Sequence, residues 1–195
     1  ATISGWSDAW IYVYDAALGQ WESSCSAINV YGADTWNGQL YFSGLNEPWN
    51  GGYGQDNYIS RYEPDSVYTA DGGLVLHDSI IQTVGNSASV AIDDQGNFYY
   101  ASYSFENSTL YMWTQDQVGS VVNDIANGQE DIFLTLADAQ LLTSLDGGGN
   151  GIAVDDAGNV FVTINGGNNG SQLIMWNNSM GTGDGLLYET IAMSD

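Results

Sequence analysis

The segment IAVDDAGNVFV at residues 152–162 decides the fold, because it repeats the segment VAIDDQGNFYY at residues 90–100. The two copies lie 62 residues apart and align without a gap. A fainter copy, NGQLYF, occupies residues 37–42, which is 58 residues before its counterpart. Each copy has apolar and aromatic runs around a turn rich in Gly and Asn. A period near 60 residues that carries strand–turn–strand units predicts a radial or stacked all-β architecture.

The repeat predicts three modules of four short strands, each bounded by Gly, Asn or Asp. The expected strands are residues 28–33, 39–43, 58–62 and 74–81 in the first module, 89–93, 97–102, 109–113 and 131–136 in the second, and 151–155, 159–164, 172–176 and 186–193 in the third. Two further strands are expected at residues 9–14 and 20–26, and a short helix at 137–143.

These elements predict a single all-β domain, a β-propeller-like array of four-stranded antiparallel blades. Its expected parts are a half blade at 1–27 and blades at approximately 28–86, 87–147 and 148–195. We expect about three and a half blades to be too few to close a ring within one chain. Terminal blades of an open array leave sheet edges that partners satisfy.

The charge of the chain excludes several classes of partner. The 195 residues include 24 acids and one cation, Arg61, which gives a formal net charge of −23. Such a chain has no electrostatic basis for binding nucleic acid or an anionic membrane. Its carboxylates repel one another and disfavour compaction, so high salt, divalent cations or a cationic partner should relieve the repulsion. Calcium is the cofactor we expect, because it takes oxygen ligands.

Cysteine and histidine usage excludes further chemistry. The chain has one cysteine, Cys25, and one histidine, His77, so it forms no internal disulfide and has no set of histidines for zinc. A nucleophile would need His77 as its base, and no Ser or Cys cluster surrounds it in the sequence. No apolar run approaches the roughly 20 residues of a membrane-spanning helix. The opening ATISGW resembles a terminus left by signal-peptide cleavage, so we expect a secreted or extracellular protein, with the periplasm as the alternative.

The segment GIAVDDAGNVFV at residues 151–162 resembles the blade signature of NHL-repeat and SMP-30/gluconolactonase-like β-propellers. The resemblance implies four-stranded blades whose first strands line a central channel, in rings that usually have about six or seven blades. For SMP-30-like enzymes it also implies a divalent metal in the channel, held by a Glu, an Asn and an Asp. The pair Asn150-Gly151 matches the position of that Asn, and no residue matches the Glu.

On this resemblance, Asn150 with Asp93 or Asp155 would hold calcium near the channel. The residues themselves offer a second interpretation, because Asp, Asn and Gly favour tight turns between strands. Asp146 opens the segment DGGGNG, which partly matches the spacing of oxygen ligands in a calcium loop. A plain glycine-rich connector is the alternative for that segment.

An aromatic and amide-rich segment, WNGGYGQDNY, occupies residues 49–58. Its Trp49, Tyr53, Asp56 and Tyr58 are candidates for binding a ligand such as a glycan, through stacking and directional hydrogen bonds. The same residue types are enriched at protein interfaces, so self-association is a second interpretation. A loop that packs on itself is the third.

These observations leave three hypotheses for function. The first is a non-enzymatic exported scaffold that self-associates, as a homo-oligomer or fibre, or binds another surface protein or a glycan. The second is a calcium-dependent lactonase-like hydrolase, or a fragment of one, in which calcium polarises a carbonyl. The third is a glycan-binding module centred on Trp49 and Tyr53.

Overall fold

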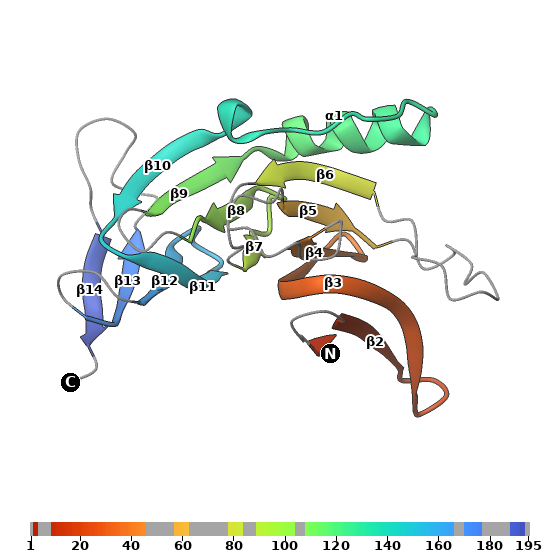
Figure 1. Ribbon diagram of the computed structural model, residues 1–195, viewed down its shortest axis with the longest axis horizontal. Coiled ribbons are helices and arrows are strands. Elements are labelled where there is room, and N and C mark those ends of the chain that lie inside the picture. Colours follow the sequence, from red (N-terminus) through yellow and green to blue (C-terminus); the bar gives the residue numbers. More distant parts are fainter. Residues whose placement is uncertain are drawn as a thin grey trace.

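The computed structural model describes residues 2–3, 9–45, 57–62, 78–83, 89–103, 108–165, 170–176 and 188–193. Over these residues the chain is mostly β and forms three antiparallel sheets of six, four and four strands (Figure 1). Neighbouring strands in each sheet follow one another in the sequence. The all-β prediction is therefore confirmed. No helix in the described part of the chain is long and apolar enough to span a bilayer.

The first sheet contains a long strand where the sequence predicts two. Its strands are β1 (Thr2–Ile3), β2 (Ala9–Asp15), β3 (Gln20–Trp36), β4 (Gln39–Leu45), β5 (Asn57–Arg61) and β6 (Asp78–Thr83). The prediction of separate strands at 20–26 and 28–33 is wrong, because Ser26, Ala27 and Ile28 include no residue that forces a turn. The boundary expected after residue 27 therefore falls inside β3.

The second and third sheets each have four strands, as the repeat predicts. The second sheet consists of β7 (Val90–Ile92), β8 (Phe98–Ala101), β9 (Ser108–Trp113) and β10 (Gln140–Leu145). The third consists of β11 (Gly148–Val154), β12 (Val160–Asn165), β13 (Gln172–Trp176) and β14 (Tyr188–Met193).

The last strand of the second sheet lies later in the chain than the sequence predicts. The strand expected at 131–136 and the helix expected at 137–143 are both wrong. Instead, helix α1 (Gln115–Ala126) and the 3-10 turn η1 (Leu136–Asp138) precede β10. Thr114 caps α1: its Oγ accepts from the Gln117 amide at 3.4 Å, and Gln117 Oε1 accepts from the Thr114 amide at 2.9 Å.

The apolar run Ile132–Leu134 does join a sheet, but as an addition to the first one. Leu134 forms a parallel bridge with Ile81. The Gln82 amide donates to the Leu134 carbonyl at 2.7 Å, and the Leu134 amide donates to the Ile80 carbonyl at 2.9 Å. Helix α1 lies beside the same strand, β6 (Figure 1). The segment between β9 and β10 therefore covers the β6 edge of the first sheet, which would otherwise be open to pairing.

The first strands of the modules lie side by side, with β7 between β3 and β11. The Ile92 amide donates to Asp34 Oδ2 at 2.8 Å, and the Ser89 hydroxyl donates to the Tyr31 carbonyl at 3.3 Å. Both contacts join residues 58 positions apart, so β3 and β7 run in the same direction. The three sheets share one buried core that is centred on the second sheet.

Candidate functional site

The first Asp-Asp-x-Gly-Asn segment forms the turn between β7 and β8. Asp93 Oδ1 accepts from the amides of Gln95 and Asn97 at 2.9 and 2.8 Å, and Oδ2 accepts from Asn97 Nδ2 at 2.9 Å. Gly96 has a φ of +83°, which disfavours residues with a side chain. The turn places Gly96 against the side chain of Trp36, because a Cβ at position 96 would lie 2.6 Å from the Trp36 ring. Asp93 is therefore a turn former, as one interpretation of the sequence predicts.

The second copy of the segment repeats this geometry between β11 and β12. Asp155 Oδ1 accepts from the amides of Ala157 and Asn159 at 3.0 and 2.8 Å, and Oδ2 accepts from Asn159 Nδ2 at 2.9 Å. The Asn159 side chain, followed by the turn amides, holds the pKa of Asp155 below its usual value, because these bonds favour the carboxylate.

The two turns differ at one position. The Tyr99 hydroxyl donates to Asp93 Oδ2 at 3.0 Å, whereas the equivalent residue of the third sheet is Phe161. Burial, followed by the nearby Asp93 charge, raises the pKa of Tyr99, so its hydroxyl remains a donor well into the alkaline range. Phe161 has no hydroxyl and makes its strand more apolar at this position.

The structure separates the predicted metal ligands into two pairs. Asn150 lies in the first half of β11 and Asp155 just beyond its end, roughly 16 Å apart at about 3.3 Å per residue. The Ser89 amide donates to the Asn150 carbonyl at 3.4 Å, which places the start of β7 beside Asn150. Asp93 therefore lies at the Asp155 end, and Asp146 precedes β11 at the Asn150 end. These four residues do not fit a single coordination site.

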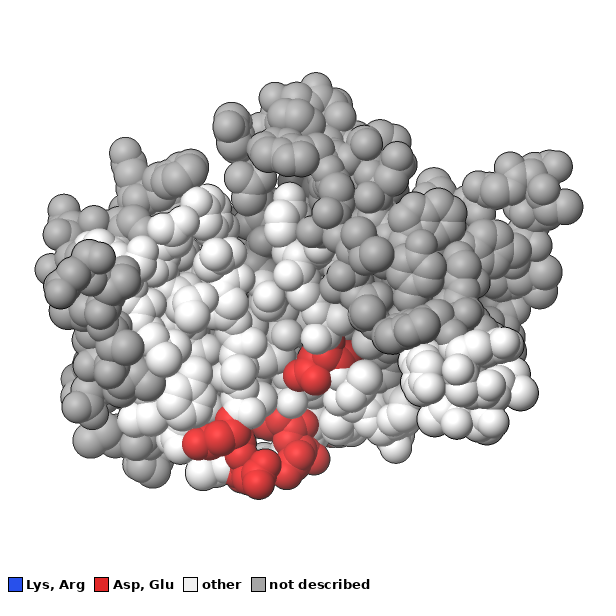
Figure 2. Space-filling view, turned by 90° about the horizontal axis from the view of Figure 1, so that it is seen from below, with Lys and Arg blue, Asp and Glu red and all other residues white. Residues whose placement is uncertain are grey.

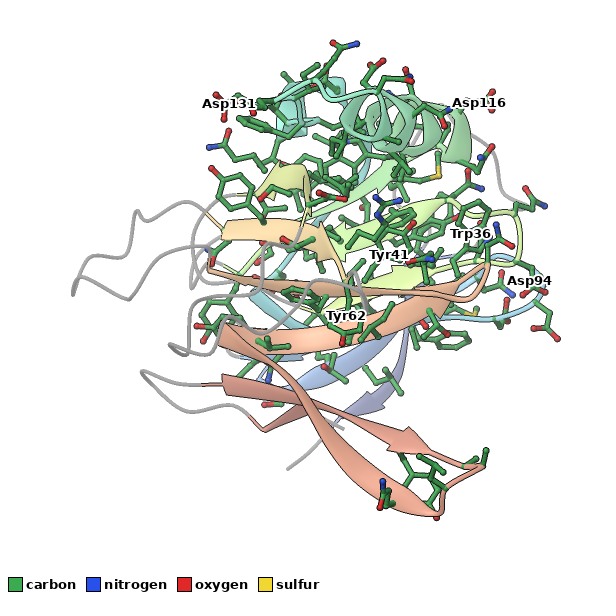
Figure 3. All side chains as sticks on the ribbon, turned by 90° about the vertical axis from the view of Figure 1, so that its right-hand side faces the viewer. Trp36, Tyr41, Tyr62, Asp94, Asp116 and Asp131 are labelled. Atoms are coloured by element: carbon green, nitrogen blue, oxygen red, sulfur yellow. The ribbon has the colours of Figure 1, made fainter. Side chains whose placement is uncertain are left out.

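No group of three or more His, Cys, Asp or Glu residues is placed to share a metal ion in the part of the chain that the structure describes. Figure 2 shows Asp and Glu side chains gathered in two groups near one edge of the lower face, with no Lys or Arg on the described part of that face. Asp94 and Trp36 lie at the same side of the molecule (Figure 3). Calcium binding stays a prediction.

Most of the predicted aromatic site lies outside the described residues, namely Trp49, Tyr53 and Asp56. Tyr58 is described, on β5, and is partly buried. Its ring packs edge-on against Phe133 with centroids 5.8 Å apart, and its hydroxyl accepts from Gln82 Nε2 at 3.4 Å. Tyr58 thus helps to hold the segment between β9 and β10 against the first sheet.

One row of side chains recurs across neighbouring strands of the second and third sheets. The register partners are Ala91, Tyr99 and Met112 in the second sheet, and Ala153, Phe161 and Met175 in the third. In the first sheet, Tyr41 of β4 is the counterpart of Tyr99 in the 58-residue repeat. Because the registers match, these rows lie on the same face of each sheet.

In the first two sheets this face packs on the next sheet. Tyr41 contacts Phe98 of the second sheet edge-on, with centroids 4.8 Å apart, inside the stack (Figure 3). Tyr99 and Ala101, on one face of β8, are 2% and 0% exposed. Strand β11 covers that face so closely that a Cβ on its Gly149 would lie 2.7 Å from the Ala101 Cβ. The first and second sheets therefore each pack the face that carries Tyr41 or Tyr99 on the sheet that follows.

In the third sheet the same face has no successor among the described residues. Ala153 and Thr163 are exposed, and Phe161, Leu173 and Met175 are partly exposed. These five residues are called the outer face below. The opposite face is the one that packs on the second sheet, and its Val160, Val162 and Ile164 are at most 2% exposed. Over β11, β12 and β13, the third sheet is thus well buried on one side only.

The sequence reasoning missed the outer face. Its residues follow the same pattern as the buried row of the second sheet, so the pattern alone does not show which row lacks a neighbour. The one signal available is the replacement of Tyr99 by Phe161, which removes the partner of the turn carboxylate.

A scan against protein-family models and a search of curated protein sequences both return no match for this chain.

Proposed function

We propose that this protein is a non-enzymatic, exported scaffold, a propeller-like array of stacked blades that works by associating through its outer face. One contrast between the sheets carries the proposal: Tyr99 is buried between two sheets, while Phe161 at the matching position of the third sheet is partly exposed. An apolar sheet face of this kind is stabilised when a partner removes it from water. The side-by-side first strands β3, β7 and β11 support the propeller-like arrangement.

The composition of the outer face fits association rather than chemistry. Strands β11, β12 and β13 contain no acid and no base, in a chain whose net charge is −23, and the fourth strand, β14, has Glu189 as the register partner of Met175. A partner that approaches these strands meets less repulsion than it would at the acid-rich turns. We propose that the partner is a further copy of the chain or another surface in an extracellular assembly, with bound calcium or salt damping the repulsion.

The other two hypotheses have less support. The hydrolase hypothesis needs carboxylates that converge on Asn150, and Asp93 and Asp155 lie at the far ends of their strands. The glycan-binding hypothesis depends on Trp49 and Tyr53, which lie outside the described residues.

Sedimentation equilibrium tests the proposal. We expect the wild-type chain to show a mass above 20.9 kDa that rises with protein concentration and with salt. Phe161→Glu should return the mass to that of one chain, because it places a charge on the outer face. Leu141→Glu is the matched control, since Leu141 is 60% exposed on β10, away from this face. A wild-type protein that remains a single chain under all these conditions would contradict self-association.

A further inference from the structure

Three Asn-Gly pairs lie where the structure describes both residues, namely Asn37-Gly38, Asn127-Gly128 and Asn150-Gly151. Asn is a chemically labile residue, and a following Gly leaves its own backbone nitrogen unshielded because it has no side chain. All three Asn residues are exposed. Sequence and exposure therefore do not distinguish the three pairs, whereas the hydrogen bonds of their backbones do.

The reaction open to such a pair is loss of the Asn side-chain amide. Solvent base removes the proton of the Gly N–H group, and the nitrogen attacks the side-chain carbonyl carbon of the preceding Asn. A C–N bond forms, and the side-chain amino group leaves as ammonia. Water then opens the cyclic imide at either carbonyl, which gives Asp or isoaspartate. The step needs a Gly nitrogen that is not engaged as a donor and a peptide group that can rotate.

In two of the pairs the attacking nitrogen is already engaged as a donor. The Gly128 amide donates to the Ile125 carbonyl at 2.8 Å, in the turn that ends α1. The Gly151 amide donates to Thr163 Oγ1 at 2.7 Å. The carbonyl of that same peptide group accepts from the Ser89 amide at 3.4 Å, so the group is held at both ends. Attack at either pair would first break these bonds, which costs free energy.

The pair Asn37-Gly38 has no such protection. It forms the two-residue turn between β3 and β4, where Trp36 and Gln39 are the last register partners. Both turn residues are left-handed, with φ of +49° and +76°. The Gly38 amide donates to no residue that the structure describes, and a Cβ on Gly38 would meet nothing within 4 Å. Its nitrogen is therefore open to solvent base and has room to turn toward the Asn37 side chain.

We infer that Asn37 is a modification site, the position among these three pairs at which the folded chain first loses a side-chain amide to water. Each product adds one negative charge to a chain of −23. Isoaspartate also adds a carbon to the main chain of a turn whose length sets the register of β3 and β4. The change reaches the packing between sheets, because the neighbouring Trp36 ring lies against Gly96 of the second sheet.

Peptide mapping by mass spectrometry tests the inference on the folded wild type, incubated at mildly alkaline pH and low protein concentration. Asn37 should convert at least roughly fivefold faster than Asn127 or Asn150, the factor that one ordinary hydrogen bond represents. In denaturant these bonds are absent, so the three rates should approach one another. Conversion of Asn127 or Asn150 as fast as Asn37 in the folded protein would overturn the inference, and so would the same ratios in denaturant.

Thr163→Val is the sharpest variant, because it removes the acceptor of the Gly151 amide and keeps the shape of the side chain. Conversion at Asn150 should rise roughly fivefold, while Asn37 and Asn127 keep their wild-type rates as internal controls. A wild-type near-UV circular dichroism spectrum would show that the variant is folded. An unchanged rate at Asn150 in that folded variant would mean that the hydrogen bond of the Gly nitrogen does not control the reaction, and the ranking would fail.

Discussion

The second and third sheets have nearly the same sequence pattern but different surroundings. In the second sheet every residue of β7 and β8 is buried, because the first sheet covers one face and the third sheet covers the other. In the third sheet, β12 alternates between buried residues and residues that are partly or fully exposed. The difference shows that a blade pattern determines which residues form a strand and a turn. The burial of each face depends on the neighbouring sheet.

The largest expected effect compares the two aromatic residues of this row. Tyr99→Ala should lower the free energy of unfolding by about 3–5 kcal/mol, the range for removing a buried aromatic ring from a core. Phe161→Ala should cost about 1 kcal/mol or less, because its ring is already partly in water. Denaturant unfolding, at a protein concentration low enough to keep the chain dissociated, measures both losses.

Equal losses for Tyr99→Ala and Phe161→Ala would contradict the difference in burial between the two sheets, because they would show that the outer face is covered within a single chain. A smaller loss for Phe161→Ala at low protein concentration, which grows as the protein is concentrated, would instead support the association of outer faces.

Much of the third sheet could be predicted from the sequence, because its signals are local. The turn at Asp155 and Asn159 follows from residue types that bond their own backbone, and the repeat fixes the flanking strands. The route between β9 and β10 was harder to predict. Thr114 and Gln117 have the residue types of a helix cap, so the start of α1 has a local signal. The apolar run at 132–134, in contrast, has the composition of a strand that could belong to the second sheet. Its actual partner, β6, lies about 50 residues earlier and has no local signal.

The outer face could not be predicted for a related reason. Ala153, Phe161 and Met175 match the pattern of a row that is buried in the second sheet, and burial depends on what packs against a face. The resemblance matched only Asn150 to a metal ligand, and strand geometry places Asp155, five residues further along the chain, roughly 16 Å from it.

A smaller effect is expected where the second and third sheets touch. Gly149→Ala should lower the free energy of unfolding by about 1–3 kcal/mol, because its Cβ would lie 2.7 Å from the Ala101 Cβ and 3.2 Å from the Ser102 carbonyl. Gly119→Ala is the matched control in α1, where the new Cβ meets only the flexible end of Gln115. It should raise stability by about 0.5–1 kcal/mol, as Ala does over Gly inside a helix.

Opposite signs for these two Gly→Ala changes, measured by denaturant unfolding, would show that the second and third sheets are in close contact. A Gly149→Ala protein as stable as the wild type would mean that β11 can move away from β8 at little cost, and the contrast between the two sheets would be weaker than their burial indicates.

The smallest expected effect concerns the turn of the third sheet and depends on pH. The folded state lowers the pKa of Asp155 from 3.8, mainly through the Asn159 side chain, so the carboxylate stabilises the fold above that pH. This contribution is lost as the pH falls below 3.8 and the group is protonated in the folded state. Thermal unfolding of wild type and Asp155→Asn between pH 7 and pH 2 should therefore show a gap that closes at the acid end.

Asp156→Asn is the control, because it makes the same charge change on the adjacent exposed residue, which is not among the acceptors of the turn's hydrogen bonds. If the two variants show the same gap, the effect comes from net charge alone, as repulsion in a chain of −23 would produce. A gap confined to Asp155→Asn assigns it to the turn. The turn would then stabilise the third sheet through its own hydrogen bonds, while the outer face beside it remains available for a partner.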